Sequence, residues 1–172
     1  MTSISRSNSI MGFPCSLILK AGLLAGTLDI LSAFLYSYIK TGTTPVVILQ
    51  YIAKVAFGKT TFTPQGPAGD PTVLTITGLL VHFAIAFSWT VLFFFLYSRI
   101  KLMRQNKILT AFVYGIFVWA MMSIVILPLW NNKAFVFKAE NAAISAAILI
   151  IAIGLPLSFI AHNYYSKKAT NL

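Results

Sequence analysis

Apolar residues in this chain gather in long continuous runs that polar segments separate. Four of the runs are long enough for a helix that crosses a bilayer, because the hydrocarbon core needs about 20 apolar residues. They cover residues 16–39, 71–98, 108–130 and 141–165. The pattern predicts an all-α polytopic membrane protein, in which residues 1–172 form a single membrane domain with four transmembrane helices.

A shorter apolar segment lies between the first two runs. Thr44 suits the N-cap of a helix, Pro45 its first turn and Gly58 the position after its end, so we expect a helix over residues 45–57. At 1.5 Å per residue this helix is about 20 Å long, which is too short to span a bilayer. We favour a helix that lies in the membrane interface, and the alternative is a re-entrant helix that plugs a cavity.

The composition indicates the same solvent. The chain is 58% hydrophobic and 9% charged, whereas soluble domains carry about a quarter of charged residues. Most of its surface is therefore expected to face the lipid bilayer. The net charge is +10, but the 13 lysines and arginines lie mostly between the apolar runs. That distribution is typical of membrane loops and excludes nucleic acid as a partner.

The basic residues also predict an orientation. They are concentrated in the loop between the second and third runs and in the tail after the fourth run. These residues are Arg99, Lys101, Arg104, Lys107, Lys167 and Lys168. Because short basic loops stay on the inner side of a membrane, we expect both termini to be cytoplasmic.

Few residues could carry chemistry. Cys15 is the single cysteine, so we expect no intrachain disulfide and no cysteine metal cluster. His82 is expected near the middle of the membrane and His162 near the cytoplasmic end of the fourth helix, so the two cannot bind one haem iron. The sequence also lacks the common hydrolase and phosphate-binding motifs. We therefore expect no enzymatic activity, no catalytic residue, no cofactor and no metal site.

One acid lies inside the first apolar run, although the chain has only three acids. At 100° per residue, Gly22, Gly26 and Asp29 share one face of the first helix, and Gly78 and His82 share one face of the second. Small residues four apart let helices approach closely, so we predict a helix-packing face formed by the three glycines. Asp29 is then expected to point into protein rather than into lipid.

Asp29 and His82 are also expected at one depth. Counted from the start of each run, Asp29 lies about 20 Å in from one side and His82 about 16 Å in from the other, in a core of about 30 Å. We predict an intramembrane polar pair in which the carboxylate hydrogen bonds to the imidazole, directly or through one water. If the pair does not form, Ser88, Ser123 and Tyr114 are the next candidates to bond the acid.

Four segments of the chain form a combination found elsewhere. They read AGLLAGTLDILSAF, PVVILQYIA, GLLVHFAIAF and YGIFVWAMMSIVILPL. Together they resemble an uncharacterised family of small bacterial four-helix integral membrane proteins, and the likeness extends over residues 21–129. The resemblance implies a four-helix layout and the bacterial inner membrane. It implies no activity, substrate or cofactor.

Three classes of function fit these residues. We favour a structural or accessory subunit in which Asp29 and His82 form a buried polar pair. The alternative is a proton-linked or small-solute transport component, because ionisable residues inside a membrane are costly and mark functional sites. Four helices make a thin wall around a solute path, so such a component would act as a homodimer or larger membrane complex, joined through the glycine face. An intramembrane enzyme is the least favoured class.

Overall fold

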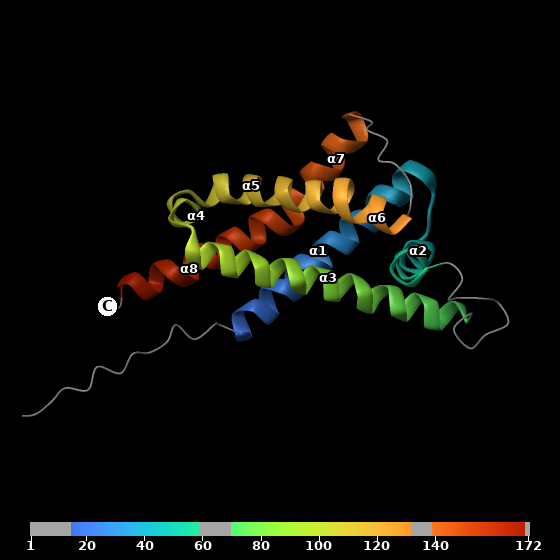
Figure 1. Ribbon diagram of the computed structural model, residues 1–172, viewed down its shortest axis with the longest axis horizontal. Helices are drawn as coiled ribbons and strands as arrows, with labels where there is room; N and C mark the ends of the chain where they lie inside the picture. The colour runs from blue at the N-terminus through green and yellow to red at the C-terminus, as the bar shows by residue number, and fades with distance from the viewer. Residues whose placement is uncertain (1–14, 59–69, 132–138, 171–172) are drawn as a thin grey trace, which may run out of the picture.

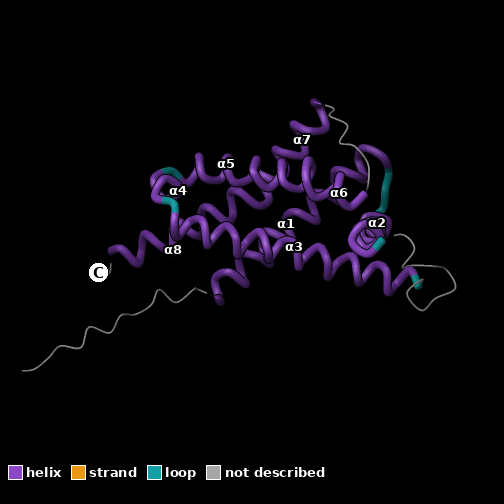
Figure 2. Tube along the Cα trace, viewed as in Figure 1, coloured by secondary structure: helices purple, strands orange, loops and turns teal. Residues whose placement is uncertain are grey.

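The computed structural model describes residues 15–58, 70–131 and 139–170, and every regular element in these ranges is a helix (Figure 2). Four helical stretches are long and apolar enough to cross a membrane. Their bounds are Cys15–Thr41, Pro71–Arg99, Lys107–Leu129 and Ala139–Lys167. The predicted all-α architecture of four long apolar helices and one short helix is therefore confirmed, and it is the architecture of a membrane protein.

The chain folds as a bundle whose two ends differ. Figure 1 shows α4 and the C-terminal end of α8 at one end, and α2, α6 and the start of α7 at the other. We refer to these as the α4 end and the α2 end. In chain order the helical segments are α1 (Cys15–Thr41), α2 (Pro45–Phe57), α3 (Pro71–Arg99), α4 (Lys101–Gln105), α5 (Lys107–Ala120), η3 (Met121–Ile126), α6 (Leu127–Asn131), α7 (Ala139–Leu149), η4 (Ile150–Gly154) and α8 (Leu155–Thr170).

Side-chain caps fix where α3 and α5 begin. The carboxylate of Asp70 accepts a hydrogen bond from the backbone N–H of Thr72 at 2.6 Å, and Pro71 occupies the first turn of α3. This bond lowers the pKa of the exposed Asp70 carboxyl below its ordinary value. The side chain of Asn106 caps α5 in the same way, through the N–H of Ile108 at 2.9 Å. Both long helices therefore start at a defined residue.

Glycines let α1 and α3 pack closely. A Cβ atom on Gly26 would lie 3.0 Å from the Cβ of Ala86 and 3.0 Å from the ring of Phe83, both on α3. A Cβ atom on Gly22 would collide with the ring of Phe87 on the same helix. The glycine face of α1 is therefore occupied within the chain and is not available to a second copy.

Gly78 takes part in a different contact. A Cβ atom there would overlap the carbonyl of Leu49, so the backbone of α2 rests directly on α3. The side-chain amide of Gln50 also donates to the carbonyl of Pro71 at 3.3 Å. Figure 1 looks nearly along the axis of α2, while α3 runs across the view, so α2 crosses α3. The face of α3 that carries Gly78 is thus shared between α2 and α1.

The third and fourth long helices each contain a π-helical segment just before a proline. The segment η3 ends two residues before Pro128, and η4 ends two residues before Pro156. Proline lacks an N–H group and its ring clashes with the carbonyl four residues back, so the helix cannot keep its regular hydrogen bonds there. Single π turns inside α-helices occur frequently at functional sites.

Packing is dense toward the α4 end. Phe93 and Tyr114 meet there with ring centroids 4.8 Å apart, and both side chains are buried. The hydroxyl of Ser158 on α8 donates to the carbonyl of Lys107 at the start of α5, at 2.5 Å. Aromatic side chains fill this half of the bundle. A cavity of about 320 Å³ with an almost entirely apolar lining remains at this end, between α3, α4 and α5. The cavity that contains polar and ionisable side chains lies toward the α2 end.

Candidate functional site

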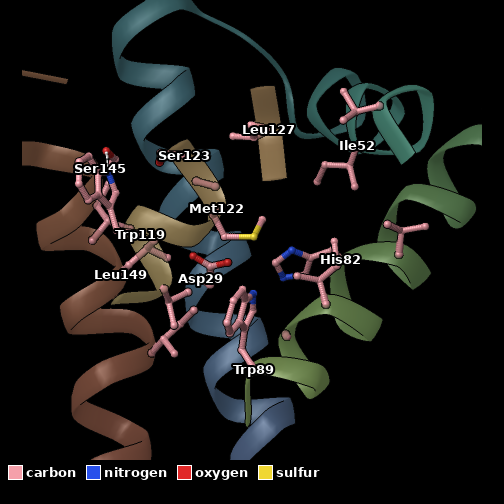
Figure 3. Close-up of a pocket in the computed structure, with 18 of the residues that line it drawn as sticks. Asp29, Ile52, His82, Trp89, Trp119, Met122, Ser123, Leu127, Ser145 and Leu149 are labelled. Carbon is pink, nitrogen blue, oxygen red and sulfur yellow. Dashed lines mark hydrogen bonds between the residues drawn. The ribbon is translucent and has the colours of Figure 1, made fainter. Parts of the chain in front are cut away.

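A cavity of about 310 Å³ lies on the α2 side of the bundle (Figure 3), and its walls come from α1, α2, α3, α5, η3, α6, α7 and η4. Its walls are mainly aliphatic and aromatic. A small number of polar groups in an apolar pocket is the usual composition of a small-molecule site. Polar side chains in the lining include Asp29, His82, Tyr36, Tyr51, Ser123 and Ser145.

Asp29 projects from the middle of α1 into this cavity. In Figure 3 its carboxylate and the ring of His82 point toward one another, with the side chain of Met122 beside them. Within the described residues no hydrogen bond reaches the carboxylate, and the ionisable group that interacts with it electrostatically is His82. The acid therefore faces an open volume instead of a fixed hydrogen-bond partner.

The imidazole of His82 is oriented by a backbone carbonyl. Its Nε2 lies 2.9 Å from the carbonyl oxygen of Gly26, and the residue is 9% exposed. A carbonyl oxygen only accepts hydrogen bonds, so Nε2 carries a hydrogen and donates it. Nδ1 is then the nitrogen that can take up a second proton. The same bond ties α3 to α1, one turn before Asp29.

The structure thus brings both members of the predicted polar pair to one cavity, but it gives the imidazole another partner. His82 hydrogen bonds to Gly26, and no direct hydrogen bond joins it to Asp29 within the described residues. The water-bridged form of the pair stays a prediction.

Three other polar side chains were predicted as possible partners of Asp29, and one of them lies at the same cavity. Ser123 lines the cavity that Asp29 faces. Ser88 donates to the carbonyl of Ala84 in its own helix at 2.8 Å. Tyr114 donates to the carbonyl of Trp89 at 2.5 Å. Ser123 is therefore the one of the three that shares a surface with the acid.

Aromatic rings form a large part of the cavity wall. Tyr36 and Tyr51 line it from α1 and α2, and Trp89 and Trp119 line it from α3 and α5. The indole N–H of Trp119 donates to the hydroxyl of Ser145 at 2.8 Å, which orients the ring. Trp119 was not among the residues that the sequence singled out. The sequence signal that could have identified Trp119 is its position in the middle of an apolar run, because the tryptophans of interfacial belts lie near the ends of such runs.

The remaining candidates do not join this site. His162 lies on α8 and does not line the cavity. In residues 15–58, 70–131 and 139–170, no three His, Cys, Asp or Glu side chains gather in a way that could hold a metal ion. No protein-family model, curated protein or solved structure matches this chain. The chemistry of the cavity is therefore what indicates a function.

Proposed function

We propose that this chain is a small-solute transport component in which the cavity binds the solute and Asp29 exchanges a proton for it. One observation carries the proposal: Asp29 and His82 face the same cavity of about 310 Å³ inside a bundle of apolar helices. An acid placed at mid-membrane costs a few kcal/mol, so a role in ligand or proton binding explains its presence. A purely structural pair would be closed, with each group satisfying the other.

Proton linkage is supported by the ionisable groups of the cavity wall. These are Asp29, His82, Tyr36 and Tyr51. Proton relays inside membranes are commonly built from carboxyl and imidazole side chains, and Asp29 and His82 are the residues of these two types in the lining. Solute and proton would then compete for the same carboxylate, which is the simplest way to couple their movements.

A structural or accessory subunit is the second candidate. The hydrogen bond from His82 to the carbonyl of Gly26 favours it, because this bond joins α3 to α1 whether or not a solute binds. In that case the complex would contain a larger partner, and the cavity would be covered by it.

A homodimer or larger membrane complex is part of either proposal. Gly22 and Gly26 pack against α3, and Gly78 packs against α2. A second copy would therefore use another surface. The lipid-facing side of α5 offers large exposed apolar residues, among them Phe112 at 50% and Val113 at 60% exposed.

The test of transport is a flux measurement. The chain is reconstituted in liposomes that hold a pH-sensitive dye and an imposed pH gradient. Organic solutes that are cationic, neutral or anionic are then added in turn. Transport predicts that at least one class of solute accelerates the collapse of the gradient. If none does, and a larger membrane protein co-purifies with the chain, the accessory function is the correct one.

We also propose that the protein lies in the bacterial inner membrane with both termini in the cytoplasm. The resemblance to small bacterial membrane proteins supports the membrane. The side chains of Arg99, Lys101, Arg104 and Lys107 support the orientation, because they gather at the α4 end. The cavity then lies in the outer half of the bundle, on the side of α2.

Reporter fusions test this orientation. A reporter fused after Lys168 is expected to give a cytoplasmic signal, and one inserted within residues 133–138 a periplasmic signal. Each reporter is placed at both sites, so the two fusions serve as controls for each other. A periplasmic signal from the C-terminal fusion would reverse the proposed orientation.

A further inference from the structure

We propose that the cavity binds a small lipophilic organic cation, whose charged group lies beside Asp29 and whose apolar part fills the remaining volume. The inference rests on the proposed function, because it names the class of solute for the same cavity.

The charge of the cavity wall favours a cation. Asp29 is the acidic residue among the described lining residues, and neither lysine nor arginine belongs to them. Lys40 follows on the same helix, but its ammonium bonds to the hydroxyl of Tyr36 and to the side chain of Asn141. A carboxylate that leaves water without a cationic partner is strongly disfavoured. His82 is the one described lining residue that could carry a positive charge, and its Nε2 is directed at the carbonyl of Gly26. A cationic ligand supplies a permanent positive charge beside the acid.

The aromatic rings beside the acid suit the same ligand. Trp89 and Trp119 line the cavity, and the face of tryptophan is the best aromatic surface for a cation. The N–H of Trp119 is already donated to Ser145, and the ring of Trp89 is in T-shaped contact with Phe117, with centroids 5.9 Å apart. Both rings are thus oriented by the protein itself, which lowers the entropic cost of binding.

The volume limits the size of the ligand. A cavity of about 310 Å³ is at the lower end of the range for small-molecule sites, so it takes a ligand of about a dozen non-hydrogen atoms. Ile52 and Met122 face the same space (Figure 3), and the flexible thioether can adapt to ligands of different shape. The site therefore fits an amine or a quaternary ammonium attached to one ring or a short chain.

A neutral ligand and an anion fit less well. A neutral apolar molecule, such as part of a lipid tail, would fill the volume but leave the carboxylate without a partner. An anion would meet the like charge of Asp29, and the described lining offers it neither lysine nor arginine. These ligands are the competing outcomes of the binding test.

Binding is measured by calorimetry on the full chain in detergent micelles. The probes are benzyltrimethylammonium, its neutral isostere neopentylbenzene, and benzenesulfonate. The cation carries a permanent charge, so its own protonation does not complicate the result. We expect benzyltrimethylammonium to bind at least about tenfold more tightly than the isostere, and benzenesulfonate not to bind.

Three variants locate the site. Asp29→Asn should weaken cation binding by about a hundredfold and leave the affinity for neopentylbenzene unchanged. Trp119→Leu should weaken cation binding by about tenfold. Phe112→Leu, which changes an aromatic side chain on the lipid-facing side of α5, is the matched control and should have no effect. Asp29→Glu retains the charge, so binding by this variant distinguishes lost charge from lost folding.

The outcomes distinguish failure of the cation site from failure of the transport proposal. Equal affinity for the cation and its isostere, or tight binding of the sulfonate, overturns the cationic site. Transport then still stands if a neutral or anionic solute collapses the pH gradient in liposomes. Selective cation binding that depends on Asp29 supports the inference, even if no solute drives flux and the transport proposal fails.

Discussion

Replacing Asp29 with asparagine is expected to lower solute-driven proton flux to the level of protein-free liposomes. Asparagine has nearly the same size and still forms hydrogen bonds, but it carries no charge and does not release a proton. The carboxylate faces the cavity without a hydrogen-bond partner in the described residues, so the substitution breaks no contact that holds the fold. The loss of flux should therefore occur in a chain with unchanged helix content by circular dichroism.

Asp70 provides the matched control for this substitution. It is exposed at the N-cap of α3, outside the apolar helix, and asparagine is an equally good N-cap residue. Asp70→Asn makes the same chemical change and should retain the full flux. Wild-type flux in Asp29→Asn would remove proton exchange at this acid from the mechanism.

A second large effect is expected at His82, where two substitutions separate its two roles. Glutamine can still donate a hydrogen bond to the carbonyl of Gly26 but cannot take up a proton. His82→Gln should therefore fold normally and lose about tenfold in flux, because Asp29 still offers a site for the proton. Leucine can neither donate this hydrogen bond nor take up a proton. His82→Leu should therefore lose flux and, in addition, lower the free energy of unfolding by about 1 kcal/mol.

Flux and thermal unfolding of the two variants are measured together. The comparison needs no external control, since each variant is the reference for the other. If glutamine restores both stability and flux, the imidazole serves only to tie α3 to α1. That result would favour the accessory function, in which the hydrogen bond to Gly26 is the purpose of the residue.

Features set by chain length and local chemistry were predictable from the sequence. The long apolar runs gave the four long helices, because span length is fixed by the thickness of a bilayer. Thr44, Pro45 and Gly58 gave the bounds of α2, which are those observed. In both cases the deciding feature is a continuous stretch of sequence and does not depend on which helices become neighbours.

Features that depend on neighbouring helices were not predictable in the same way. A helical wheel placed Gly78 on the face of His82, but it could not show that this part of the face meets the backbone of α2. The partner of the imidazole is a backbone carbonyl, and every residue has one, so composition gave no signal for Gly26. The cavity itself is a volume left between eight helical segments, and only their packing determines it.

The thermal unfolding midpoint of Asp29→Leu shows whether the acid contributes to the stability of the bundle. We claim that Asp29 serves the chemistry of the cavity and does not hold the helices together. Leucine removes the cost of a carboxylate kept from water and adds apolar contact, so the midpoint should stay the same or rise. A midpoint several degrees lower, comparable to that of His82→Leu, would show that Asp29 holds the helices together and that its role is structural.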